Sequence, residues 1–265
     1  MIPRLLALGG HDFTARPPDR AICELMLRLA TERAGTRPRI CLLATASGDP
    51  ADQIGRFYAA FGERPCEPSD VSLFRLGRRP VELRDHLLAQ DLIYVGGGSL
   101  LNLLAVWDAH ELGAILSLAW RQGIVLAGQS AGAMCWFEAG ITKSSGRPEP
   151  GAGLGLLTGS LCVHYTDEPD RRAAYLAAVS AGMPSGYGLD DYAGLLWEGS
   201  STPSAVTAQR GARAYRVTTD NDNGEVSELP LPSRFLPAPA PAALREDIAE
   251  FRRVKRIRQG AGWLG

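Results

Sequence analysis

Short apolar runs alternate with helical patterns through the first half of the chain, and this alternation constrains the fold more than any other feature. Near-continuous apolar runs are typical of strands that are buried on both faces of a parallel sheet. The runs are RLLALGG (4–10), RICLLAT (39–45), VSLFRL (71–76), DLIYVGG (91–97) and GIVLAGQ (123–129). Between the first two, segment 19–35 repeats apolar residues at helical spacing and ends in Gly35. Repeated strand–helix–strand units predict an α/β fold with a doubly wound, mostly parallel sheet flanked by helices.

The second half of the chain is less regular. We predict a Gly/Pro/Ser-rich loop at 144–155, a helix at 171–182, an antiparallel C-terminal edge from 194–200 and 205–229 with turns at 210–212 and 220–224, and a Pro-rich segment at 230–265 containing a C-terminal helix at about 241–257. No internal repeat and no second segment with its own core is visible. The sequence therefore predicts a single α/β domain over residues 1–265.

The charge balance argues against broad electrostatic binding. Apolar residues make up 45% of the chain and charged residues 22%, as in an ordinary globular protein. The formal net charge of -1 offers no bulk attraction to nucleic acid or to an anionic membrane. The basic stretch at 250–260 is explained as the solvated end of the last helix, where cations are favourable. We therefore expect a small peptide or other small molecule as partner, with no nucleic acid and no membrane.

The lengths of the apolar runs and the spacing of the cysteines indicate the cellular location that we expect. No window approaches the roughly 18 apolar residues of a membrane span. The apolar run at the N-terminus is too short for a signal peptide and is typical of a first strand. The five cysteines, which form no C-x-x-C pair and have no histidine at metal-ligand spacing, are Cys23, Cys41, Cys66, Cys135 and Cys162. This pattern indicates reduced thiols in a cytoplasmic protein without a metal site.

Ser130 lies in the sequence Gly128-Gln129-Ser130-Ala131-Gly132, where an apolar run changes directly into a helical pattern. A strand that ends in so sharp a turn displays the central side chain at the carboxyl edge of the sheet, where ligands bind in open α/β sheets. Glycines on either side allow the backbone to pack closely. Ser130 is therefore a candidate nucleophile, with the Ala131 amide as an oxyanion donor. The alternatives are a serine that only caps the helix, and Cys135, which its helical position indicates to be a buried apolar residue.

A serine nucleophile needs a base, and the chain has four histidines. His164 follows a short apolar run and precedes a helix, a loop position where functional residues are often displayed. It is our candidate base. His11 follows the first predicted strand at the same sheet edge and is a weaker candidate, whereas His86 and His110 fall in helical stretches and are expected at the surface.

The acid that orients the base is less clearly indicated. In α/β-hydrolases the order along the chain is serine, acid, histidine. No aspartate lies between the candidate serine and histidine, where only Glu138 and Glu149 occur, so that arrangement is disfavoured. After the histidine, Asp190 and Asp191 lie in a predicted turn ahead of a strand, and either can serve as the acid.

Four motifs in this order resemble the peptidase E and cyanophycinase family of serine peptidases. They are YVGGGSLLNLLAVW (94–107), AGQSAGAMCWF (127–137), GLGLLTGSLCVHYTDEPDRRAAY (153–175) and GYGLDDYAGLLWEG (186–199). The resemblance covers the chain up to about residue 220 and includes the early ATASGD segment at 44–49. It implies a class I glutamine-amidotransferase-like α/β fold.

By position in these motifs, Ser130 matches the family's nucleophile and His164 its general base. Asp191 falls where many members have a glutamate, so Asp190 stays open as the acid. Three consecutive glycines, 96–98, let backbone N–H groups approach a substrate oxygen, and the resemblance implies that Gly97 or Gly98 is the second oxyanion donor. Ser99, a candidate helix cap, stands where members often have asparagine.

The resemblance implies acyl transfer at a peptide carbonyl without a metal or organic cofactor. Family members cut after an N-terminal aspartate in dipeptides or cut β-linked aspartyl-arginine polymers. An acidic substrate group needs a nearby cation, for which Arg171 is a candidate, although it can equally be a helix-surface residue. Gln129 and Tyr165 are further candidates for substrate binding. Two other functions stay open, an esterase or amidase acting on a non-peptide substrate and a non-catalytic binding domain, as does a homodimeric state.

Overall fold

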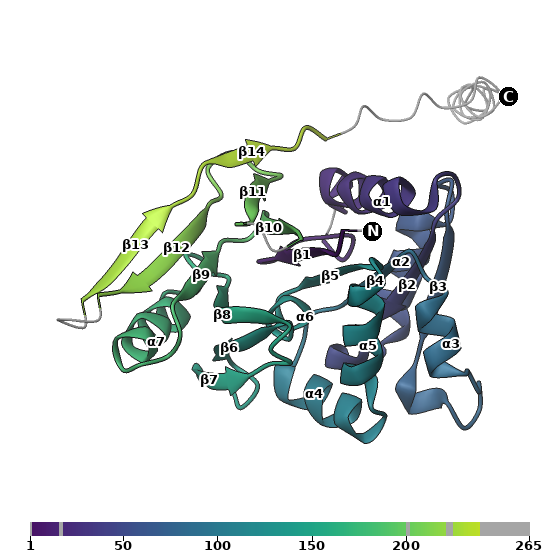
Figure 1. Cartoon of the computed structure of the whole chain (residues 1–265), viewed down its shortest axis with the longest axis horizontal. Helices are drawn as coiled ribbons and strands as arrows, with labels where there is room; N and C mark the ends of the chain where they lie inside the picture. Colours follow the sequence, from purple (N-terminus) through teal and green to yellow (C-terminus); the bar gives the residue numbers. More distant parts are fainter. Residues whose placement is uncertain (1, 16–17, 200–201, 221–224, 239–265) are drawn as a thin grey trace, which may run out of the picture.

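Two β-sheets with helices packed against them form the protein (Figure 1). The computed structural model describes residues 2–15, 18–199, 202–220 and 225–238. Within these residues the larger sheet has the strand order β14-β11-β10-β1-β5-β4-β2-β3, and the smaller sheet has the order β13-β12-β9-β8-β6-β7.

The larger sheet consists of β1 (Arg4–Leu8), β2 (Arg39–Leu43), β3 (Glu67–Val71), β4 (Leu92–Val95), β5 (Val125–Gln129), β10 (Ala193–Glu198), β11 (Ser204–Thr207) and β14 (Ser233–Phe235). Its first five strands are parallel, and β10 pairs antiparallel with β1. The structure therefore confirms the predicted α/β class, with a mostly parallel sheet and an antiparallel edge built from the later part of the chain.

The smaller sheet was not predicted as a separate sheet, and the part of the predicted antiparallel edge that forms β12 and β13 belongs to it and not to the larger sheet. It consists of β6 (Phe137–Thr142), β7 (Glu149–Ala152), β8 (Leu157–Val163), β9 (Gly186–Leu189), β12 (Ala214–Thr219) and β13 (Val226–Pro230). Strand β9 ends only a short turn before β10 of the larger sheet begins. The turn at 190–192 therefore lies where the chain passes from one sheet to the other.

Helices pack on both faces of the larger sheet. They are α1 (Arg20–Ala34), α2 (Ala51–Phe61), α3 (Leu83–Leu88), α4 (Leu100–Ala109), α5 (Leu112–Arg121) and α6 (Ala131–Met134), while α7 (Pro169–Ser180) packs on the smaller sheet. Helix α1 begins after Asp19, whose side chain accepts hydrogen bonds from the backbone N–H groups of Ala21 and Ile22. It ends at Gly35, whose φ of 89° suits glycine.

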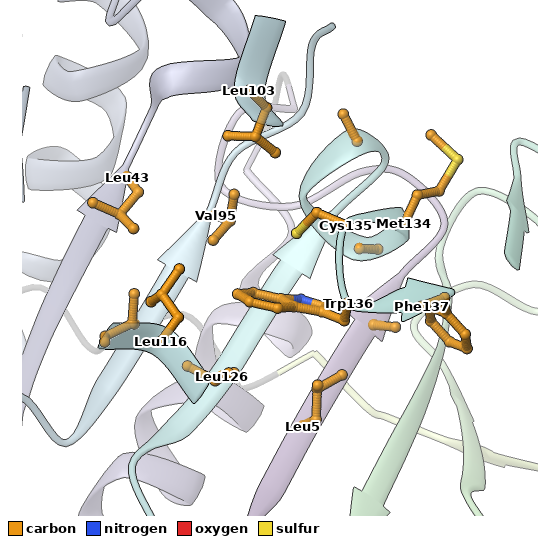
Figure 2. Close-up of a cluster of buried hydrophobic side chains, with 14 of the residues drawn as sticks. Leu5, Leu43, Val95, Leu103, Leu116, Leu126, Met134, Cys135, Trp136 and Phe137 are labelled. Carbon is orange, nitrogen blue, oxygen red and sulfur yellow. The ribbon is translucent and has the colours of Figure 1, made fainter. Parts of the chain in front are cut away.

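Four of the parallel strands, β1, β2, β4 and β5, are buried on both faces, which explains their nearly continuous apolar sequences, whereas the edge strand β3 reads EPSDV and is only partly buried. In β1, Leu5 and Ala7 belong to one apolar cluster and Leu6 and Leu8 to the other, because successive strand residues point to opposite faces. Figure 2 shows the first cluster, which includes Trp136 and residues from helices α3 to α6. Residues of α1 and α2 complete the second cluster.

Three parts of the predicted secondary structure need correction or lie outside the description. Segment 71–76 is not a strand: β3 ends at Val71 and residues 73–75 form a 3₁₀ turn. The predicted loop at 144–155 contains β7, a short strand at the edge of the smaller sheet. The predicted helix at 241–257 and the basic stretch at 250–260 lie outside the described residues, as does most of the turn at 220–224.

Among the described residues no single helix is long and apolar enough to cross a membrane. Helices α4 and α5 meet the length and composition requirement only as a pair, and they are bent by 92° relative to each other.

Candidate active site

Ser130 occupies a strained turn between β5 and α6. Its φ of 55° and ψ of -117° are unusual for a residue with a side chain. A β-carbon at Gly128 would lie 2.0 Å from the carbonyl oxygen of Gly132, and one at Gly132 would lie 2.2 Å from that of Val95. Because no other residue fits at either position, the two glycines make the sharp turn possible and leave the serine side chain at the end of the strand.

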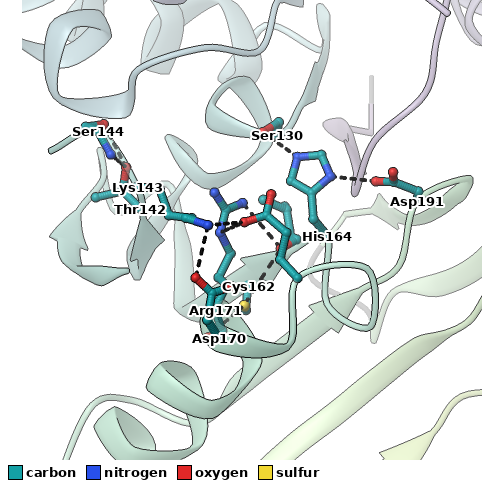
Figure 3. Close-up of polar contacts among 11 residues, drawn as sticks. Ser130, Thr142, Lys143, Ser144, Cys162, His164, Asp170, Arg171 and Asp191 are labelled. Carbon is teal, nitrogen blue, oxygen red and sulfur yellow. Dashed lines mark hydrogen bonds and ion pairs between the residues drawn. The ribbon is translucent and has the colours of Figure 1, made fainter. Parts of the chain in front are cut away.

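His164 comes from the other sheet to meet this serine. It follows β8 directly and has a φ of 54°. Its Nε2 lies 3.0 Å from Ser130 Oγ, and its Nδ1 lies 2.6 Å from Oδ1 of Asp191 (Figure 3). An ionised carboxylate only accepts hydrogen bonds, so Nδ1 carries a proton and Nε2 of the neutral ring is free to accept one from the serine.

Asp191, rather than its neighbour, faces the histidine. Asp190 is buried and accepts hydrogen bonds from the backbone N–H and hydroxyl of Thr166 and from the backbone N–H of Arg213. Burial raises the pKa of Asp190. Burial acts in the same direction on Asp191, but contacts with His164 and His11 outweigh it and leave the pKa of Asp191 below its usual range. Asp191 is therefore the ionised partner of His164.

His11, the weaker candidate base, contacts the same carboxylate and not the serine. Its Nδ1 lies 3.2 Å from Oδ2 of Asp191, and its ring stacks on Tyr192 with the centroids 4.0 Å apart. The half-buried His86 has Ser69 and Gln90 as neighbours, so the expectation that it lies at the surface is only partly met. Among the described residues, neither His11 nor His86 hydrogen-bonds to Ser130, whereas His164 does.

Cys135, the alternative nucleophile, is fully buried, and burial raises the pKa of its thiol well above the usual range. A thiol in such surroundings is a poor nucleophile. Within the described residues no group of three or more His, Cys, Asp or Glu side chains is arranged to hold a metal ion.

The glycine loop after β4 lies beside the serine. A β-carbon at Gly97 would be 3.2 Å from the Cβ of Ser130, and one at Gly98 would be 2.3 Å from the Ala46 carbonyl oxygen. The Ser99 side chain accepts a hydrogen bond from the backbone N–H of Asn102, so it caps α4 as predicted. In the described part of the chain, the amides of Gly97, Gly98 and Ala131 donate to no protein acceptor.

A pocket of about 310 Å³ opens beside Ser130. Its lining comes from the loop after β1, the segment that leads into α2, the first turns of α2, the glycine loop and the nucleophile turn. The lining residues are Thr14, Ser47, Pro50, Asp52, Gln53, Arg56, Gly97, Gly98, Gln129 and Ser130. Gln129 was predicted to contact substrate, whereas the α2 residues were missed. The only sequence signal for them was that they directly follow the ATASGD segment.

Two of the residues predicted to contact substrate, Tyr165 and Arg171, lie outside the lining of this pocket. Tyr165 is 0% exposed, packs against Tyr175 and Tyr215, and donates its hydroxyl to Glu228. Arg171 is 6% exposed and belongs to the group of ion pairs around Lys143, seen in Figure 3. Both side chains are directed into the packing beneath the His164 turn, so neither lines the pocket.

One short sequence feature next to the site was also missed. Gly9 and Gly10, at the end of β1, approach the turn at 190–191 so closely that β-carbons there would lie 2.2 Å from the Asp190 carbonyl oxygen and 2.0 Å from Asp191 Oδ1. The consecutive glycines after the first apolar run were the available signal.

Proteins of known family are similar to this chain in sequence. The model of peptidase family S51 matches residues 5–204. The uncharacterized peptidase YgaJ of Bacillus subtilis (strain 168) is 41% identical over 234 residues, which cover 88% of this chain and 99% of that protein.

Solved structures agree in fold. The crystal structure of a peptidase from an acI-B1 Actinobacterium superposes with a TM-score of 0.67 at 19% identity, covering 88% of this chain and 95% of the other. A putative peptidase E from Listeria monocytogenes EGD-e gives a TM-score of 0.58 at 15% identity, covering 79% and 100%. The predicted resemblance is thus confirmed: the chain belongs to peptidase family S51, the peptidase E family, and is a serine peptidase.

Proposed function

We propose that Ser130, His164 and Asp191 form the catalytic triad of this peptidase and that it hydrolyses small peptides through an acyl-enzyme. The carrying observation is the continuous chain of contacts from the serine hydroxyl through the imidazole to the carboxylate, 3.0 Å and 2.6 Å long. These are the lengths at which a base takes the proton of a serine nucleophile and an acid orients that base.

In the proposed reaction, Ser130 Oγ attacks the carbonyl carbon of the scissile bond while Nε2 of His164 takes its proton. The amides of Gly97, Gly98 and Ala131 hold the negative oxygen of the tetrahedral intermediate. When the C–N bond breaks, the protonated Nε2 gives its proton to the leaving amine. A water molecule, activated by the same nitrogen, then attacks the acyl-enzyme and releases the acid product together with the serine.

The pocket supports an N-terminal aspartyl residue as the preferred substrate group. Arg56 and Asp52 bring one positive and one negative charge to the pocket, with Arg56 Nη2 lying 2.9 Å from Asp52 Oδ2. Nε of Arg56 is buried without a hydrogen-bond partner among the described residues. A guanidinium suits a carboxylate, and a carboxylate suits an ammonium group. The pair therefore matches an aspartyl residue with a free amino terminus.

A covalent probe tests the nucleophile. A fluorophosphonate should label the wild-type protein and the Ser117→Ala control, whose serine lies on α5 away from the pocket, but not Ser130→Ala. Labelling of Ser130→Ala would show that another residue is the nucleophile.

A dipeptide panel tests the substrate. Asp-Ala should be cleaved with a kcat/KM at least about tenfold above Leu-Ala and Arg-Ala, since a charge-assisted contact between a guanidinium and a substrate carboxylate is worth this much or more. Equal rates on the three dipeptides would remove the aspartyl preference but leave the serine peptidase assignment standing.

A further inference from the structure

The carboxylate of Asp191 faces two imidazole rings, one on each oxygen. Oδ1 contacts Nδ1 of His164 at 2.6 Å, and Oδ2 lies 3.2 Å from Nδ1 of His11. In the triad of the proposed function, only His164 has a role. The contact of His11 with the same carboxylate therefore needs an explanation of its own.

The backbone holds His11 close to this carboxylate. The N–H of Gly9 donates to the carbonyl oxygen of Ala193 at 2.9 Å, and the N–H of Tyr192 donates to that of Gly10 at 3.1 Å. These two bonds tie the end of β1 to the turn that carries Asp191. The contact is thus part of the junction between the two sheets and not a chance meeting of surface side chains.

The His11 side chain is held in place and still reaches solvent. Its backbone φ is 60°, and its ring stacks on Tyr192 at a centroid distance of 4.0 Å and an interplanar angle of 22°. The side chain is 36% exposed, so a proton can reach it from water. An imidazole can carry a positive charge, and at this position that charge would lie beside Asp191.

We propose that His11 is a positioning residue that shares the charge of Asp191 with His164 and thereby keeps His164 competent as a base in more acidic solution. The inference rests on the triad of the proposed function. When His11 is protonated, it pairs with Asp191 and partly neutralises the carboxylate. A second positive charge on His164 is then less favourable, because two imidazolium ions would share one carboxylate. His164 stays neutral, and able to accept the serine proton, at a lower pH than it would beside Asp191 alone.

Apart from His164, the other titratable groups around His11 are acids, so none of them can replace it as a cation. The titratable side chains that interact with His11 or with the turn residues Asp191 and Tyr192 are those of Asp12, Asp19, Asp167, His164, Asp191 and Tyr192. All of these except His164 are acids. His11 is therefore the cation that balances Asp191 on the side away from His164.

The test compares the pH dependence of fluorophosphonate labelling, which needs no knowledge of the substrate. His11→Asn removes the charge, and asparagine tolerates a positive φ. His11→Lys keeps a positive charge at every pH used. His110→Asn is the control, since His110 caps the C-terminal end of α4 and is not among the described residues that contact the triad.

We expect the labelling rate of His11→Asn to match the wild type near pH 8 but to fall off in acid at a midpoint higher by about half a pH unit or more. His11→Lys should keep the wild-type midpoint or lower it, and His110→Asn should not change it. An unchanged midpoint in His11→Asn, or the same upward shift in His11→Lys, would overturn the proposal.

Failure of the triad itself would look different. If the wild type were not labelled at any pH, or if His164→Ala were labelled as fast as the wild type, the proposed function would fail. A wild type that labels normally, with His11→Asn following the same pH curve, would leave the triad intact and remove only the role of His11.

Discussion

A β-carbon at Gly10 would lie 2.0 Å from Oδ1 of Asp191. This added β-carbon would also lie 2.9 Å from Cε1 of His164, so the end of β1 packs against both Asp191 and His164. A residue without a side chain thus sets how near the first strand can come to the proposed triad. The geometry of the site depends on this close approach as well as on the three reacting groups.

Gly10→Ala is therefore expected to displace Asp191 and the His164 ring and to lower kcat by about 100-fold, the usual effect of moving a catalytic group by about 1 Å. The variant should still fold, because Asp191 is partly exposed and can move outward. Turnover of Asp-Ala measures the loss of kcat, and circular dichroism of the same sample measures whether the variant is folded. Wild-type kcat would show that the loop adapts without disturbing the pair.

Gly55→Ala is the matched glycine substitution. Gly55 lies inside α2 on the exposed side, with no heavy atom within 4 Å of an added β-carbon. Alanine loses less backbone entropy than glycine when it folds into a helix, so the free energy of unfolding should rise by about 0.5–1 kcal/mol. Urea unfolding measures this gain. A loss of stability would mean that the helix is strained at this position.

Exchanging each aspartate of the 190–191 pair for asparagine should separate catalysis from stability. Asp191→Asn should lower kcat by about 10⁴-fold, because the amide favours the wrong tautomer of His164. Asp190→Asn should retain most of the activity but lose about 1–3 kcal/mol of unfolding free energy, since the buried carboxylate accepts three hydrogen bonds. The reverse pattern would make Asp190 the catalytic acid.

Glu228 makes stability depend on pH. It accepts two hydrogen bonds of 2.9 Å from Arg172 and one of 2.5 Å from the Tyr165 hydroxyl. Burial raises its pKa, but these bonds outweigh burial and leave the pKa of Glu228 below its usual range. A depressed pKa means that the stabilisation is complete above the unfolded value of about 4.3 and disappears as the pH falls through the folded value.

Glu228→Gln should accordingly lose about 1 kcal/mol of unfolding free energy at pH 7, a modest value because the Arg172 side chain is 42% exposed and screened by water. The difference from the wild type should shrink below about pH 4. Urea unfolding at pH 7, 5 and 3.5 measures it, with Glu63→Gln at an exposed position as the control. A difference that stays constant with pH would contradict the role of the charge.

The central parallel strands and the turn at Ser130 were predictable because their signals are local, whereas the pairing of Ser130 with His164 was predicted from the loop position of His164 and from the family resemblance. Four of the parallel strands, β1, β2, β4 and β5, are nearly uninterrupted apolar runs, and the nucleophile lies between two glycines that its sharp turn requires. The smaller sheet lacks such signals. Strand β7, for example, reads EPGA, contains a proline and a glycine, and alternates between half-buried and exposed residues at a sheet edge. A sequence of this kind is indistinguishable from a loop.

The differences between the predicted substrate contacts and the pocket lining have a different physical cause. Tyr165 and Arg171 were chosen because they lie close to His164 in sequence, but a turn at positive φ separates neighbours and sends them into the packing around α7. Arg56 was missed because an arginine on an amphipathic helix is most often solvated. Only the common carboxyl edge of the parallel strands brings α2 and its charged residues beside Ser130.

Arg56 is the residue with which the proposed substrate preference can be tested most directly. Arg56→Gln should lower kcat/KM for Asp-Ala by about 10- to 100-fold, because a two-pronged contact with the substrate carboxylate is lost. The same variant should change kcat/KM for Leu-Ala by less than about threefold, since the triad is untouched. Folding should be preserved, because the partner Asp52 is 65% exposed and is not left as a buried unpaired charge.

Arg64→Gln is the matched control for this experiment: its guanidinium pairs with Glu24 and lies outside the pocket lining. It should leave both rates as they are. If Arg56→Gln lowered kcat/KM for the two dipeptides by the same factor, Arg56 would support the shape of the pocket without binding the acidic group of the substrate. If neither rate changed, the acidic group would have to be recognised elsewhere, and the charge pair on α2 would no longer support an aspartyl substrate.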